Sequence, residues 1–72
     1  MTYREETAYL KMLGTADADA LACHGNPAIR KTAGLVRRMA VRHQHGEFDA
    51  KDDQDCESIL FFAGADEIRR AL

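Results

Sequence analysis

Side chains that could hold a metal ion are few and scattered in this sequence. The possible ligands are Cys23, His24, His43, His45 and Cys56. They form neither a Cys-x-x-Cys pair nor a His-x-x-x-His pair, the spacings that bring two ligands to one metal. His43 and His45 stand two positions apart, so on a helix they do not face each other. The sequence therefore predicts no metal and no cofactor, with one half-buried histidine and two at the surface.

Catalytic groups are also not assembled by the sequence. Cys23 precedes His24, but adjacent helical residues point about 100° apart and no third group is available to orient the histidine. The glycines are scattered and form no phosphate-binding loop. Asp52, Asp53 and Asp55 lack the central glycine and closing glutamate of a calcium loop. These patterns predict a protein that is not an enzyme.

The charged residues are strongly segregated along the chain, although the net charge is only −2. Residues 26–45 carry cations and no acid: Arg30, Lys31, Arg37, Arg38 and Arg42. Residues 47–57 carry Lys51 among many acids: Glu47, Asp49, Asp52, Asp53, Asp55 and Glu57. The acids could fold back beside the basic helix, or the two patches could stay apart and attract partners. We expect the second, because Lys31, Arg38 and Arg42 project opposite the apolar stripe of their helix. The predicted partner-binding cations are thus Lys31, Arg37, Arg38 and Arg42.

Nucleic-acid binding by the basic helix, residues 27–45, is the alternative function. The turn at Gly25 and Asn26 and the arginines after it favour this alternative. However, a helix-turn-helix counted from Gly25 would need buried apolar residues where Lys31 and Gly34 stand. No aromatic residue lies among these cations, so the usual stacking platform for single strands is missing. A protein is therefore the expected partner.

The elements that must position these residues are predicted to be helices in a single domain, residues 1–72. Thr2 and Glu5 form the Thr-x-x-Glu capping box of a first helix. Asn26 and Pro27 mark the start of the basic helix, which Gly46 ends. The last helix begins with Asp49 or Asp53 as its cap.

The number of helices depends on Gly14. One helix could continue through it, since an internal glycine costs only about 1 kcal/mol, or Thr15 could cap a new short helix. We therefore predict an all-α fold, a small bundle of three or possibly four helices. No apolar run is long enough to span a membrane. With only two cysteines and no secretory segment, the sequence predicts a cytoplasmic protein with reduced thiols.

Residues 56–72 carry apolar side chains on two sides when they are drawn as one helix. One side holds Cys56, Ile59, Leu60 and Ala63, and the nearly opposite side holds Phe61, Ala65, Ile68 and Leu72. A helix that is apolar nearly all round must be buried nearly all round. Shorter helices of the same chain can cover only one side, so we predict a homodimer. Its interface residues would be Phe61, Phe62, Ile68 and Leu72.

A short stretch resembles a known family. Residues 61–66, Phe-Phe-Ala-Gly-Ala-Asp, resemble the aromatic-small-Ala-Asp stretch of the Hha family. Members of this family are small helical modulators of bacterial nucleoid proteins. Residues 7–10 resemble the first helix of the family. The resemblance implies that Asp66 contacts the partner and that the partner is a nucleoid protein. The chain departs from the family in its long basic middle segment and in ending soon after the motif, so we do not assign it to the family.

Together these features predict a small protein that binds another protein and does no catalysis itself. A regulator, an inhibitor or an adaptor would act through such helix surfaces, as do the accessory proteins of phages and mobile elements.

Overall fold

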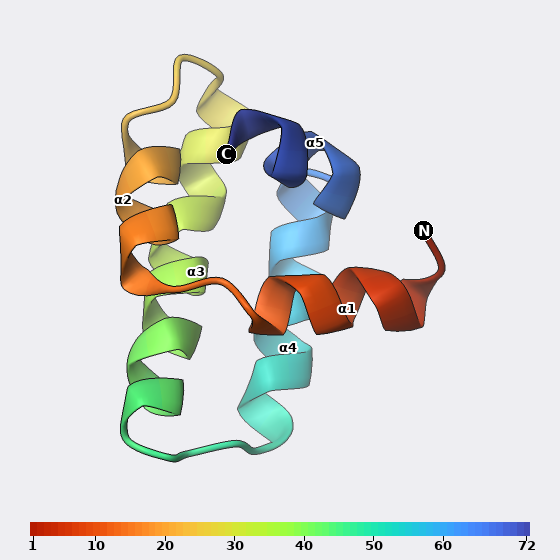
Figure 1. The fold of residues 1–72 in the computed structure, drawn as a ribbon. Helices are drawn as coiled ribbons and strands as arrows, with labels where there is room; N and C mark the ends of the chain where they lie inside the picture. The colour runs from red at the N-terminus through yellow and green to blue at the C-terminus, as the bar shows by residue number, and fades with distance from the viewer.

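The computed structural model describes residues 1–72 and contains five helices and no strand (Figure 1). The helices are α1 (Tyr3–Lys11), α2 (Thr15–Ala22), α3 (Pro27–Gln44), α4 (Ala50–Phe62) and α5 (Ala65–Ala71). The all-α prediction is confirmed. The predicted number of three or four helices was too low, because the chain breaks both near Gly14 and at Ala63 and Gly64. None of the helices is both long and apolar enough to cross a membrane.

The helices α2, α3 and α4 run up, down and up along the molecule (Figure 1). α2 packs antiparallel to α3, and α3 and α4 form an antiparallel hairpin. α1 crosses α4, and α5 lies against α1 and α3. The hairpin turn begins at Gly46, whose φ of 75° lies in the left-handed region that favours glycine. This turn returns the acidic segment alongside the basic helix.

The predicted caps account for most of the helix starts. Thr2 and Glu5 form the capping box of α1. The Asn26 side chain accepts a hydrogen bond of 2.9 Å from the amide of Ala28, and Pro27 is the first residue of α3. Of the two possible caps of α4, Asp49 is the one used, since its carboxylate accepts from the Lys51 amide at 2.8 Å. Local chemistry thus fixes where these three helices begin.

The chain breaks at Gly14 without using Thr15 as the cap. Gly14 itself is the cap residue of α2, and its amide donates to the carboxylate of Asp17 at 2.8 Å. A second break follows α4, where Ala63 (φ −156°, ψ 145°) and Gly64 (φ −71°, ψ 157°) are extended. The expectation of one helix over residues 56–72 was therefore wrong. Cys56, Ile59 and Ala63 of one side and Ile68 of the other are buried in one core because the chain changes direction between them, whereas Phe61 of α4 stays exposed.

The core contains aliphatic and sulfur-containing side chains from all five helices and no aromatic ring. Its buried residues are Leu10, Leu13, Ala18, Leu21, Ile29, Ala33, Val36, Met39, Cys56, Ile59, Ala63 and Ile68. All three phenylalanines of the chain lie outside this cluster. Phe48 is 71% exposed, Phe61 is 84% exposed and Phe62 is 38% exposed. The largest apolar side chains of the sequence are therefore at the surface.

Candidate functional site

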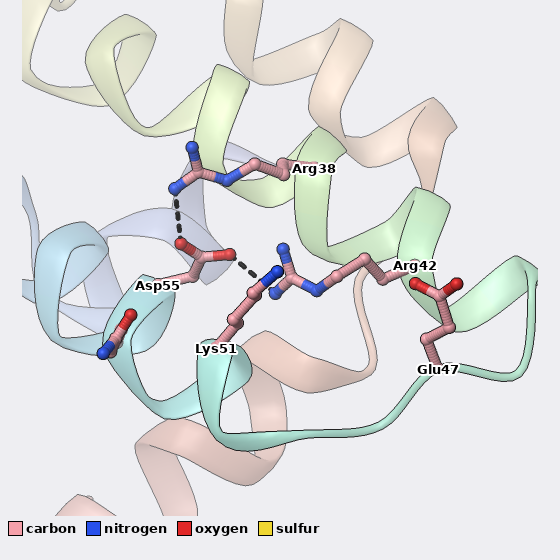
Figure 2. Close-up of a pocket in the computed structure, with 6 residues that line it drawn as sticks. Arg38, Arg42, Glu47, Lys51 and Asp55 are labelled. Carbon is pink, nitrogen blue, oxygen red and sulfur yellow. Dashed lines mark hydrogen bonds and ion pairs between the residues drawn. The ribbon is translucent and has the colours of Figure 1, made fainter.

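The lower part of the α3–α4 hairpin is held together by buried ion pairs. The side chains of Asp52 and Asp55 on α4 are only 5% exposed, and that of Arg42 on α3 is 11% exposed. Arg42 Nη2 donates to Asp52 Oδ1 at 2.8 Å and to Asp55 Oδ2 at 2.7 Å. Arg38 Nη2 donates to Asp55 Oδ1 at 2.6 Å (Figure 2). We call Arg38, Arg42, His43, Asp52 and Asp55 the ionic cluster.

The expectation that the cations stay apart from the acids was therefore wrong for Arg38 and Arg42. The reason lies in the register of α4, where Asp52, Asp55 and Ile59 follow each other at spacings of three and four and share the inward side of the helix. Two carboxylates buried in this way need opposite charges close by. The arginines of α3 supply them.

His43 completes the ionic cluster. Its Nε2 lies 2.7 Å from Asp52 Oδ2, and its ring stacks on Phe48 with centroids 4.6 Å apart. An ionised carboxylate can only accept hydrogen bonds, so Nε2 must carry the proton. With this contact, both oxygens of Asp52 and both oxygens of Asp55 have a partner.

The cluster keeps both aspartates ionised. Burial raises the pKa of Asp52, but hydrogen bonds from Arg42 and His43 lower it by more, so it lies below its usual range. Burial likewise raises the pKa of Asp55, and hydrogen bonds from Arg38 and Arg42 lower it by more. The hydrogen bonds to Asp52 and Asp55 raise the pKa of Arg42. Each carboxylate oxygen of the two aspartates contacts a side chain of α3, so the cluster joins α3 to α4.

A polar hollow of about 520 Å³ opens beside the ionic cluster (Figure 2). Its lining contains no apolar residue and consists of Arg38, Arg42, Glu47, Lys51, Gln54 and Asp55. The side chain of Arg38 is 62% exposed, and Lys51 is an exposed residue that forms no ion pair. Cationic groups at the rim of the hollow are therefore accessible.

The other end of the α3–α4 hairpin carries an aromatic patch, which we define as Phe61 and Phe62. Their rings meet edge to face with centroids 5.4 Å apart. The ammonium group of Lys31 on α3 lies 5.9 Å from the centroid of the Phe62 ring, within the range of a cation–π contact. A shallow hollow lies at this patch, lined by Glu57, Ser58, Phe61 and Phe62. The tertiary structure thus brings a cation and aromatic rings together, which the sequence order does not.

The remaining predicted site residues lie elsewhere or inside the chain. Arg37 projects toward α2 and pairs with Asp19. Asp66 pairs with Arg69 of its own helix, at 3.3 Å. Leu72 is 44% exposed at the end of the chain, but Ile68 is fully buried in the chain's own core. Ile68 is therefore removed from the predicted dimer interface, because the break before α5 turns it inward.

The two cysteines are free, and neither has the surroundings of an activated thiol. Cys23 is exposed and Cys56 is buried. Burial raises the pKa of the Cys56 thiol to about 11, which keeps it protonated and unreactive. Beside Cys23, the Nδ1 atom of His24 accepts a hydrogen bond of 3.0 Å from the Asn26 amide. This nitrogen is thus occupied by the start of α3.

Several residues of the site were missed at the level of the sequence. The buried role of Asp52 and Asp55 could have been inferred, because they extend the Ile59 stripe toward the start of the helix. Lys51 and Gln54 give no such signal. They become relevant only because the hairpin places them opposite Arg38.

Comparison with known proteins leaves the site to be interpreted from its geometry. No protein-family model matches the chain, and neither curated proteins nor solved structures give a match. The resemblance of residues 61–66 to the Hha family is thus limited to the stretches that suggested it.

Proposed function

We propose that the chain is a non-enzymatic protein-binding module, a small regulator, inhibitor or adaptor, and that the aromatic patch is its main contact. The observation that carries this proposal is the 84% exposure of Phe61 beside Phe62, in a chain whose core contains no aromatic ring. Burying a phenylalanine contributes about 1.5–3 kcal/mol to stability. The fold leaves that contribution unused at Phe61. Aromatic side chains are frequent anchors of protein interfaces, where a partner buries them.

The ion pairs of α3 favour a protein partner over nucleic acid. Arg42 is nearly buried between two aspartates, and Arg37 is paired with Asp19. These two arginines were central to the nucleic-acid alternative. Nucleic-acid binding draws most of its affinity from several phosphate contacts at once. Few unpaired cations remain on α3 to make them.

A second copy of the chain is one partner that the aromatic patch would accept. The predicted homodimer interface is reduced by the loss of Ile68 and would rest on Phe61, Phe62 and Leu72. If a second copy is the occupant, light scattering gives twice the mass of the chain. The variant Phe61→Ser would then return it to a monomer without unfolding it, because this side chain is already exposed.

Site-specific photo-crosslinking in the native host cells tests the proposal. A photoreactive phenylalanine analogue at position 61 should label a discrete protein. The matched control places the same analogue at Met12, which follows α1 as its C-cap, is 81% exposed and lies outside the aromatic patch. Equal labelling from both positions, or no discrete protein at position 61, would count against the proposed function.

A further inference from the structure

The aromatic patch is bordered by one cation and one acid, on opposite sides of Phe61. The ammonium group of Lys31 on α3 lies near the Phe62 ring, with 5.9 Å to its centroid. Glu57 lines the shallow hollow at the patch. At about 100° per residue, Glu57 and Phe62 flank Phe61 on opposite sides of α4. The order across the surface is therefore Glu57, Phe61, Phe62 and Lys31.

The side of α4 that carries Glu57 faces α1. Asp53, one turn earlier on α4, pairs with Lys11 of α1 at 3.1 Å. The pKa of Tyr3, also on α1, is raised by partial burial and secondly by the charge of Glu57. Glu57 and Lys31 are both exposed, and neither forms an ion pair within the chain. The patch thus has one unpaired charge of each sign, at opposite edges.

We propose that a second copy of the chain occupies the aromatic patch, in a two-fold symmetric dimer held by Phe61 and by reciprocal pairs between Lys31 and Glu57. This inference rests on the proposed function and names the partner. In a two-fold interface, a contact from one residue to another is repeated in the reverse direction. A two-fold axis that crosses Phe61 between the two charges brings Lys31 of each copy opposite Glu57 of the other. Both pairs then join opposite charges.

Phe61 supplies the apolar centre of this interface. Its ring is 84% exposed and lies close to the axis, so the two Phe61 rings meet each other and the neighbouring Phe62 rings. The patch is small beside the area of about 800 Å² per partner that a stable complex buries. We therefore expect a weak and reversible dimer, with a dissociation constant of about 0.1 mM.

The balanced charge of the patch favours a second copy over a partner of one sign. A nucleic acid or an acidic segment would be attracted by Lys31 and repelled by Glu57. A basic segment would meet the reverse. A surface that carries both signs in the opposite order, across an apolar centre, satisfies both groups. The aromatic patch of a second copy is such a surface.

Mixing two charge-reversal variants of the intact chain tests the reciprocal pairs. Lys31→Glu alone and Glu57→Lys alone each place like charges at both pairs, so each variant should dimerise about tenfold more weakly at low salt. An equimolar mixture forms a heterodimer in which both pairs again join opposite charges. Sedimentation equilibrium at up to about 1 mM chain should return its dissociation constant to within about threefold of that of the unchanged chain.

The matched control pair is Lys51→Glu and Glu47→Lys. These residues are exposed charges at the polar hollow, away from the aromatic patch, and form no ion pair. Their replacement changes the net charge by the same amounts, and neither variant nor their mixture should alter dimerisation. Thermal melting followed by circular dichroism checks that all four variants fold. Phe61→Ser tests the apolar centre separately and should remove the dimer.

Other outcomes separate the inference from the proposed function. A chain that stays monomeric at the highest concentration would overturn the inference, and so would a mixture that dimerises no more tightly than its two components. A dimer that survives Phe61→Ser would lie elsewhere on the chain and would also overturn it. Crosslinking at position 61 decides the proposed function independently. A labelled host protein of different mass, in the absence of a dimer, would leave that function standing and remove the second copy as the occupant.

Discussion

Replacing Arg42 by Met should cost the chain a large part of its stability. Met has a similar unbranched stem and no charge, so Asp52 would keep only His43 as a partner and Asp55 would keep only Arg38. Removing one partner of a buried ion pair typically costs about 3–5 kcal/mol, because it leaves a charge buried without compensation. Both carboxylates that Arg42 contacts are 5% exposed, so this buried-pair magnitude applies. A chain of 72 residues has a total stability of about 4–11 kcal/mol. The variant should therefore lose a large part of this stability and, at the lower end of the range, unfold.

Urea denaturation followed by far-ultraviolet circular dichroism near neutral pH measures this loss. The matched control is Arg37→Met on the same helix. Arg37 and Asp19 form an exposed pair, with side chains 47% and 68% exposed, and such pairs contribute only about 0–1 kcal/mol. Adding Asp52→Asn and Asp55→Asn to the Arg42 variant should restore part of the stability, because the uncompensated charges are then removed. Equal losses in the two methionine variants would refute the buried role of Arg42.

Three further predictions concern stability. The pKa values of Asp52 and Asp55 are lower in the folded chain than in the unfolded one. The two aspartates therefore stabilise the fold fully above the unfolded pKa of about 4, and this stabilisation is lost as the pH falls through the lower folded pKa. Melting temperatures measured across this range should fall at acid pH, and less steeply when both aspartates are replaced by Asn. Gly34→Ala should raise the melting temperature by about 4–8 °C, since an added Cβ meets no atom within 4 Å and the helical preference gained is about 1 kcal/mol. An unchanged or lower value would show that the glycine is needed within the fold. Gly46→Ala should lower the unfolding free energy by about 1–2 kcal/mol, and with it the melting temperature, because φ is positive at this position. An unchanged melting temperature would mean that the turn relaxes at little cost.

The parts of the fold that could be predicted are those fixed by neighbouring residues. The capping box of Thr2 and Glu5, the start at Asn26 and Pro27, and the end at Gly46 all depend on contacts within a few positions. The break at Gly64 was missed, because a glycine costs too little inside a helix to decide by itself whether the helix continues. Packing of Ile59 and Ile68 into one core decides it. The single helix expected over residues 56–72 is therefore the end of α4 followed by α5.

The candidate site was predictable in its residue types but not in its pairing. The sequence identified Lys31, Arg38 and Phe61 as surface groups that could meet a partner. It could not reveal that Arg42 is occupied internally, because the burial of a charge depends on what a distant segment brings to it. The accessible cations at the rim of the polar hollow, Arg38 and Lys51, also depend on how α3 pairs with α4. Lys51 is available only because Asp52 and Asp55 are not exposed beside it.

The ionic cluster also limits how this chain can change over generations. Arg42, Asp52 and Asp55 each satisfy a charge that would otherwise be buried alone, so a single substitution at any of them is penalised. An apolar set that replaced all of them together could be as stable, or more so. Sequences that keep only part of the ionic cluster are less stable than those that keep all of it or replace all of it. Natural variants of the protein should therefore carry the cluster whole or lack it whole, and these positions should be inherited as a unit.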